Sequence, residues 1–165
     1  MSSAIVPQRE QITRVSSSVT WEHATAEVGR PSPNVAAVAL VLVVDDEPDV
    51  RLIARLVLTS AGYEVIEAES GEAALAHLEG EQQPDAVLLD VRMKGIDGWE
   101  TLRRLRQDLS QEELPVVIFT ANIAARTDAP KPWQGYQHFL TKPFDPDALL
   151  EAVAQAIGAS DATES

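Results

Sequence analysis

The chain has 165 residues, of which 45% are hydrophobic and 24% charged, and 26 acidic against 13 basic residues give a net charge of −13. This length fits one domain of about 100–150 residues with a single substantial core. The acidic balance argues against direct electrostatic binding of nucleic acid. The absence of cysteine excludes disulfides, thiolate zinc sites and cysteine nucleophiles, and it fits a reducing compartment.

The first 38 residues differ from the rest of the chain. They carry three acidic and three basic side chains, so the whole net charge lies beyond them. A serine run and the linker-like segment Arg30–Asn34 predict a disordered extension over 1–38, with a docked or partner-binding tail as the alternative. Residues 158–165 are predicted to form a flexible tail. The longest apolar run, Val35–Val44, is half of what a membrane helix needs, so we expect a cytoplasmic protein without membrane insertion.

Between these ends, apolar strand patterns alternate with helical ones. The first strand is an uninterrupted valine-rich run, as expected of a strand that is buried on both faces. The predicted strands are Ala39–Val44, Tyr63–Ala68, Pro84–Leu89, Pro115–Thr120 and His138–Thr141. Strands that alternate with crossover helices predict an α/β fold with a mostly parallel sheet.

The predicted helices follow the apolar period of 3.6 residues. The first begins at Pro48 and ends before Gly62, with an inner face predicted to consist of Val50, Ile53, Ala54, Val57, Leu58 and Ala61. The next are Gly71–Glu79 and a helix striped by Trp99, Leu102, Leu105 and Leu109. The last begins at Pro146, with Leu149, Leu150, Val153 and Ile157 inside. Pro130 and Pro132 predict a short or broken fourth helix, about Ile123–Asp128, followed by a loop with Trp133.

Reactive side chains follow the carboxyl ends of four predicted strands. These residues are Asp45, Asp46, Asp90, Thr120 and Lys142. In parallel sheets the carboxyl ends of the strands share one edge, where ligands bind. Clustered carboxylates repel one another unless a cation joins them, and oxygen ligands favour Mg²⁺. An aspartate can attack a phosphoryl group, whose oxygens a metal and a lysine then stabilise. The pattern therefore predicts Mg²⁺-dependent phosphoryl chemistry.

Four segments resemble the receiver domain of two-component response regulators. They are Val43–Pro48, Leu88–Gly98, Phe119–Ala121 and Thr141–Phe144. The resemblance covers about residues 39–157. It implies a flavodoxin-like, doubly wound five-stranded parallel sheet with strand order 2-1-3-4-5. It also implies that a histidine kinase or phosphotransfer protein supplies the phosphoryl group.

The resemblance further implies a role for each residue at the strand ends. Asp90 is the implied phosphoryl acceptor, Lys142 pairs with the phosphoryl group, and Thr120 and Phe139 form a switch pair. The implied Mg²⁺ ligands are Asp46, Asp90, the backbone carbonyl of Arg92 and, through a bridging water, Asp45. Pro143 is expected to follow a cis peptide bond. Phe139 is equally explained as a core residue, because its ring has no hydroxyl to form a hydrogen bond.

The loop after Asp90 departs from the family pattern because it carries two basic side chains, Arg92 and Lys94. In the resembled family the position of Arg92 tunes hydrolysis of the aspartyl phosphate. We expect the guanidinium to block the path of the attacking water and slow hydrolysis. Two alternatives stay open: its charge stabilises the transition state instead, or the side chain lies in solvent.

We expect a stand-alone receiver that signals to an unknown downstream protein or relays its phosphoryl group. Its only reactions would be self-phosphorylation and self-dephosphorylation, so it is not an enzyme in the ordinary sense. The oligomeric state stays undetermined. One alternative is a phosphatase or phosphotransferase with an aspartate nucleophile, although such enzymes usually carry it on the first strand in an Asp-x-Asp arrangement. The other is a receiver-fold adaptor that is never phosphorylated, although no acidic, threonine or lysine position is missing.

Overall fold

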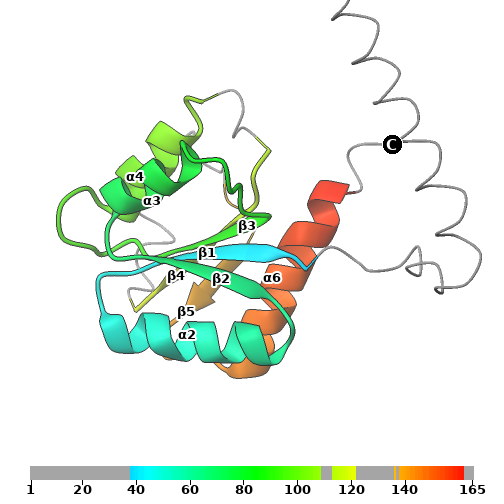
Figure 1. The fold of residues 1–165 in the computed structure, drawn as a ribbon. Coiled ribbons are helices and arrows are strands. Elements are labelled where there is room, and N and C mark those ends of the chain that lie inside the picture. Colours follow the sequence, from blue (N-terminus) through cyan, green and yellow to red (C-terminus); the bar gives the residue numbers. More distant parts are fainter. Residues whose placement is uncertain (1–37, 109–112, 122–135, 137, 162–165) are drawn as a thin grey trace, which may run out of the picture. The chain divides into compact units, whose positions relative to one another are not determined.

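The computed structural model describes residues 38–108, 113–121, 136 and 138–161, and in this part the chain forms one five-stranded sheet (Figure 1). Every strand pair is parallel, and the strand order is β2-β1-β3-β4-β5. The strands are β1 (Leu40–Val44), β2 (Glu64–Ala68), β3 (Ala86–Leu89), β4 (Val116–Thr120) and β5 (His138–Thr141). This is the predicted flavodoxin-like, doubly wound topology.

Helices cover both faces of the sheet. In the described residues they are α2 (Pro48–Ser60), α3 (Gly71–Leu78), α4 (Gly98–Leu105) and α6 (Pro146–Asp161). Figure 1 shows α3 and α4 on one face and α2 and α6 on the other. No helix in this part of the chain combines the length and the apolar character needed to cross a membrane.

Strand β1 explains why the sheet has two cores. All five of its residues are buried, and successive side chains point to opposite faces. Leu42 and Val44 pack in the cluster that includes residues of α3 and α4, whereas Val41 and Val43 pack with residues of α2 and α6. The uninterrupted apolar run is therefore what a central strand between two helical layers requires.

The predicted inner face of α2 is partly wrong. Ala54 and Leu58 are buried, but Ile53 is 51% exposed and Ala61 is also exposed. The reason is that apolar residues lie on most of the circumference of this helix, so the 3.6-residue period alone does not determine its buried face. Leu52 and Leu56 are exposed as well.

The predicted inner face of α6 is confirmed, since Leu149, Leu150, Val153 and Ile157 pack in the core. The helix then runs through Gly158 to Asp161, so the expected start of a flexible tail falls inside it. Other predictions lie outside the described residues. They are the extension over 1–37, Leu109, the helix Ile123–Asp128, the loop with Trp133, and 162–165.

Candidate metal centre

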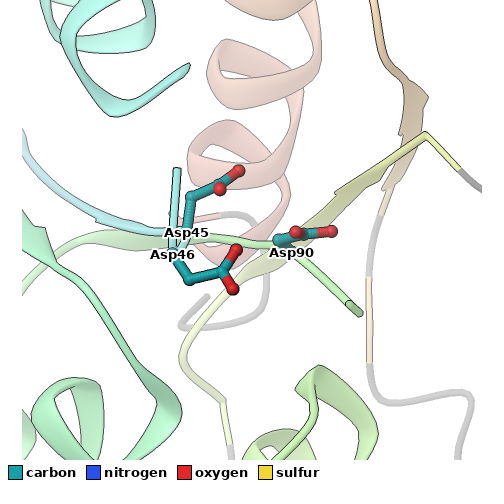
Figure 2. A group of neighbouring side chains, drawn as sticks. All are labelled: Asp45, Asp46 and Asp90. Carbon is teal, nitrogen blue, oxygen red and sulfur yellow. The ribbon is translucent and has the colours of Figure 1, made fainter. Parts of the chain in front are cut away.

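Three carboxylates meet at the carboxyl edge of the sheet. Asp45 and Asp46 follow β1 and Asp90 follows β3, and an oxygen of each lies within 4.8 Å of an oxygen of the others (Figure 2). The cause is the register of the two neighbouring strands, in which Val44 pairs with Leu89, so the next residues lie side by side. Asp45 and Asp90 are buried and Asp46 is half-buried.

Lys142 brings a positive charge into this cluster. Its Nζ forms ion pairs with Oδ2 of Asp45 and, at 3.2 Å, with Oδ2 of Asp90. It also lies 4.6 Å from the ring centroid of Phe119. Only 9% of the lysine side chain is exposed. When ionised, three carboxylates and one ammonium leave two negative charges, which one divalent cation neutralises.

Burial dominates the electrostatics of Asp45. Desolvation raises the pKa of Asp45 above its usual value, although hydrogen bonds from Lys142 and from the Glu47 main-chain N–H act in the opposite direction. The negative charge of Asp90 adds a small increase to the same pKa. A raised carboxyl pKa beside an ammonium means that the single lysine does not compensate for the lost water. The cluster therefore favours a further cation.

Main-chain N–H groups orient the three carboxylates. Glu47 donates to Oδ1 of Asp45 at 2.8 Å, Arg92 donates to Oδ1 of Asp90 at 3.2 Å, and Lys94 donates to Oδ2 of Asp46 at 3.2 Å. In Asp45 and Asp90 the other oxygen contacts Lys142. The candidate metal ligands are therefore all carboxylate oxygens, and a hydrogen bond to the main chain orients each of the three side chains. This is the chemistry that Mg²⁺ prefers.

The other predicted residues border the same edge. Thr120 is buried at the end of β4, and its carbonyl accepts a 3.0 Å hydrogen bond from the N–H of Lys142. The Lys142–Pro143 peptide bond is cis, as the resemblance implies. Phe139 is half-buried on β5, and its ring centroid lies 6.4 Å from that of Tyr136. The proposed switch role of Thr120 and Phe139 stays a prediction.

Sequence reasoning missed two neighbours of the cluster. The guanidinium of Arg51 donates a 2.7 Å hydrogen bond to the main-chain oxygen of Asp45, and it lies 3.8 Å from a carboxylate oxygen of Glu67. Phe119 forms the apolar wall under Lys142. Arg51 lies in α2, six residues after Asp45, and this spacing gave no signal for the first contact because Asp45 precedes the helix. Phe119 begins one of the four segments that resemble receiver domains, but nothing in the sequence places its ring beside Lys142.

Residues 41–154 match the family model of the response regulator receiver domain. The chain belongs to this family. A curated relative, the protein PilH of Pseudomonas aeruginosa, is 36% identical over 118 residues, which are 70% of this chain and 94% of PilH. The sensor kinase/phosphatase CqsS of Vibrio cholerae is 35% identical over 69% of this chain, but the match spans only 17% of CqsS. This receiver therefore resembles both a small protein and one segment of a much larger one.

Solved receiver structures share the fold. The chemotaxis protein CheY4 of Vibrio cholerae superposes with a TM-score of 0.67 and 30% identity, over 73% of this chain and 99% of CheY4. The response regulator TrrA of Thermotoga maritima, solved in complex with Mg²⁺ and BeF, gives a TM-score of 0.64 and 34% identity, over 72% of this chain and 98% of TrrA. Receiver domains are the phosphoryl-accepting signalling modules of two-component systems, and this chain contains one.

Proposed function

We propose that this receiver is a Mg²⁺-dependent signalling protein that is phosphorylated on Asp90 by a histidine kinase or phosphotransfer protein. One observation carries the proposal. The buried carboxylate of Asp90 lies beside the carboxylates of Asp45 and Asp46 and 3.2 Å from the ammonium of Lys142. Phosphoryl transfer needs a nucleophilic oxygen and a nearby positive charge. The Asp90 carboxylate supplies the first and Lys142 the second.

The residues divide the chemistry among them. An oxygen of Asp90 forms the new bond to phosphorus as the bond from phosphorus to the donor nitrogen breaks. Lys142, 3.2 Å from Oδ2 of Asp90, is close enough to pair with the incoming phosphoryl oxygens. The carboxylates and the Arg92 main-chain carbonyl would hold Mg²⁺, which supplies positive charge to the phosphoryl oxygens when bound. Thr120, at the next strand end, would then hydrogen-bond to the phosphoryl group.

The signal would leave through a change in protein contacts near β4 and β5. Thr120 and Phe139 lie on the same face of neighbouring strands, because Phe139 precedes the partner of Thr120 by two residues. Phe139 packs near Tyr136, whose ring centroid is 5.9 Å from that of Trp99 on α4. We therefore expect Phe139 to act through packing. The downstream target is a protein that recognises this surface.

The test is transfer from a small phosphodonor. Incubation with Mg²⁺ and acetyl phosphate should add one phosphoryl mass to the wild-type protein and none to Asp90→Asn. Asp97→Asn is the matched control, because Asp97 caps α4 and asparagine caps helices equally well. A label that survives in Asp90→Asn would show that another residue is the nucleophile. A folded wild-type protein that is never labelled would favour the adaptor function.

Arg92 would set the lifetime of the phosphorylated state. Its side chain is exposed two residues after Asp90, and its main-chain N–H is already bonded to Oδ1 of that residue. A guanidinium at this position can contact phosphoryl oxygens and occupy the path of the hydrolytic water. Arg92→Asn should therefore lose its phosphoryl group several-fold faster after the phosphodonor is removed. An unchanged or slower first-order decay would contradict this role.

A further inference from the structure

The loop between β3 and α4 carries part of the metal centre and is held by a residue outside it. The N–H of Lys94 donates to Asp46, and the N–H of Ile96 donates to Oε1 of Glu72 at 3.1 Å. Glu72 lies in the first turn of α3. Besides its bonds to the candidate metal ligands Asp90 and Asp46, the loop is thus attached to a helix that contributes no ligand.

The second attachment is a close fit. Gly95 has a φ of +81°, and a Cβ at this position would lie 2.7 and 3.0 Å from the two carboxylate oxygens of Glu72. Beside it, a Cβ on Gly71 would lie 2.1 Å from Oγ1 of Thr101 and 2.6 Å from Cγ1 of Ile96. Glycine is required at both positions because the start of α3 packs directly against the loop and α4. This packing fixes where the Glu72 carboxylate meets the loop.

The same hydrogen bonds are reflected in the pKa of Glu72. The main-chain N–H groups of Glu72 itself and of Ile96 lower the pKa of the Glu72 carboxyl below its usual value. The group is therefore ionised at neutral pH. The bond from the Ile96 N–H needs an acceptor oxygen at this position and not a full charge, because Glu72 is exposed to water.

We propose that Glu72 is a positioning residue for the Mg²⁺ site, because it fixes the loop that presents the Arg92 main-chain carbonyl. This inference rests on the proposed function. The Arg92 carbonyl lies between two anchored N–H groups. The N–H of Arg92 donates to Asp90, and the N–H of Lys94 donates to Asp46. Both acceptors belong to the metal centre and must share their oxygens with a bound ion. Glu72 has no such conflict, so it holds the loop with or without the metal.

Mg²⁺ affinity measured by calorimetry tests the proposal with matched variants. Glu72→Ala should weaken binding about tenfold, the scale expected when a partner that orients a ligand is removed. Glu72→Gln removes the charge but keeps an oxygen for the Ile96 N–H, so its affinity should stay near that of wild type. Glu72→Asp keeps the charge but is one methylene shorter, so it should behave like Glu72→Ala. Glu69→Ala is the control for charge alone, because Glu69 is exposed and lies three residues earlier.

A second measurement needs no metal. Amide hydrogen exchange followed by NMR in the presence of a chelator should show several-fold faster exchange of the Ile96 amide in Glu72→Ala and Glu72→Asp, but not in Glu72→Gln. Wild-type exchange and Mg²⁺ affinity in Glu72→Ala would overturn the inference. Equal losses of affinity in Glu72→Gln or Glu69→Ala would also overturn it, by showing an effect of charge. If the wild-type protein binds no Mg²⁺, the proposed function itself fails.

Discussion

Asp45 and Glu100 both have basic partners, but their pKa values move in opposite directions. Asp45 is paired with Lys142 at the edge of the sheet, yet burial raises its pKa. Glu100 on α4 accepts hydrogen bonds from Arg103 at 2.5 Å and Arg104 at 2.7 Å, and these bonds lower its pKa to about 2. The two clusters show that a positive partner does not by itself determine the pKa of a carboxyl group.

The difference lies in access to water. The side chain of Glu100 is 31% exposed, so it keeps much of its hydration while it gains two arginine partners. Asp45 is fully buried and loses its hydration, and one lysine shared with Asp90 does not replace it. Breaking a buried pair is costly, whereas an exposed pair contributes little. The buried cluster is thus the one that gains most from a further cation.

The largest expected effect comes from removing the positive charge of the buried cluster. Lys142→Met should lower the free energy of unfolding of the metal-free protein by about 3 kcal/mol at neutral pH, because Asp45 and Asp90 are then buried without a partner. Urea unfolding followed by far-ultraviolet circular dichroism measures the change. An unchanged midpoint would show that the lysine charge does not matter to the fold.

A double variant separates lost charge from lost packing. Adding Asp45→Asn to Lys142→Met removes the carboxylate whose pKa burial has raised, so much of the stability should return. If the double variant is less stable than Lys142→Met alone, the loss comes from packing against Phe119 and not from the unpaired carboxylate.

A smaller effect is expected from adding Mg²⁺. Mg²⁺ at 100 times its dissociation constant should stabilise the wild-type protein by about 2.7 kcal/mol, because it binds the native site only. Thermal unfolding should show this stabilisation as a higher Tm in wild type and in Glu100→Gln, because Glu100 is not among the candidate metal ligands. The increase should be much reduced in Asp46→Ala. Equal increases in Asp46→Ala and wild type would place the ion elsewhere.

The smallest effect belongs to the exposed cluster and depends on pH. The pKa of Glu100 is lowered from 4.5 to about 2 in the folded protein, so its ion pairs stabilise the fold above pH 4.5. This contribution is lost as the pH falls from 4.5 towards 2. Wild type should therefore lose its small advantage over Glu100→Gln across this interval when unfolding is measured at each pH. A difference that is constant with pH would contradict the assigned cause.

The fold was predictable because its signals are local and redundant. A strand buried on both faces needs an unbroken apolar run, and the run before Asp45 ends where the side chains become acidic. Strand β5 has the predicted bounds, and β3 begins at Ala86, two residues after the predicted start at Pro84. The buried face of α2 was not predictable in the same way. Leu58 is buried and Ile53 is exposed because of how the helix is rotated on the sheet. The sequence does not determine this rotation locally, because apolar residues lie on most sides of the helix.

The same distinction applies to the site. The acidic residues and Lys142 were predictable as neighbours because parallel strands bring their carboxyl ends to one edge. The bond from Ile96 to Glu72 was not, since it depends on the backbone conformation of Gly95 and on the packing of α3 beside the loop. Side-chain to main-chain contacts of this kind follow from the three-dimensional path of a loop, which residue spacing does not reveal.

The pairing of Lys142 with Asp45 also has a consequence for protein synthesis. The two residues are 97 positions apart in the chain, and Lys142 follows the last strand of the sheet. A protein is made from its N-terminus, so the acidic ends of β1 and β3 emerge from the ribosome well before their counter-charge. During that interval Asp45, Asp46 and Asp90 lack the ammonium of Lys142, which lies among them in the folded protein.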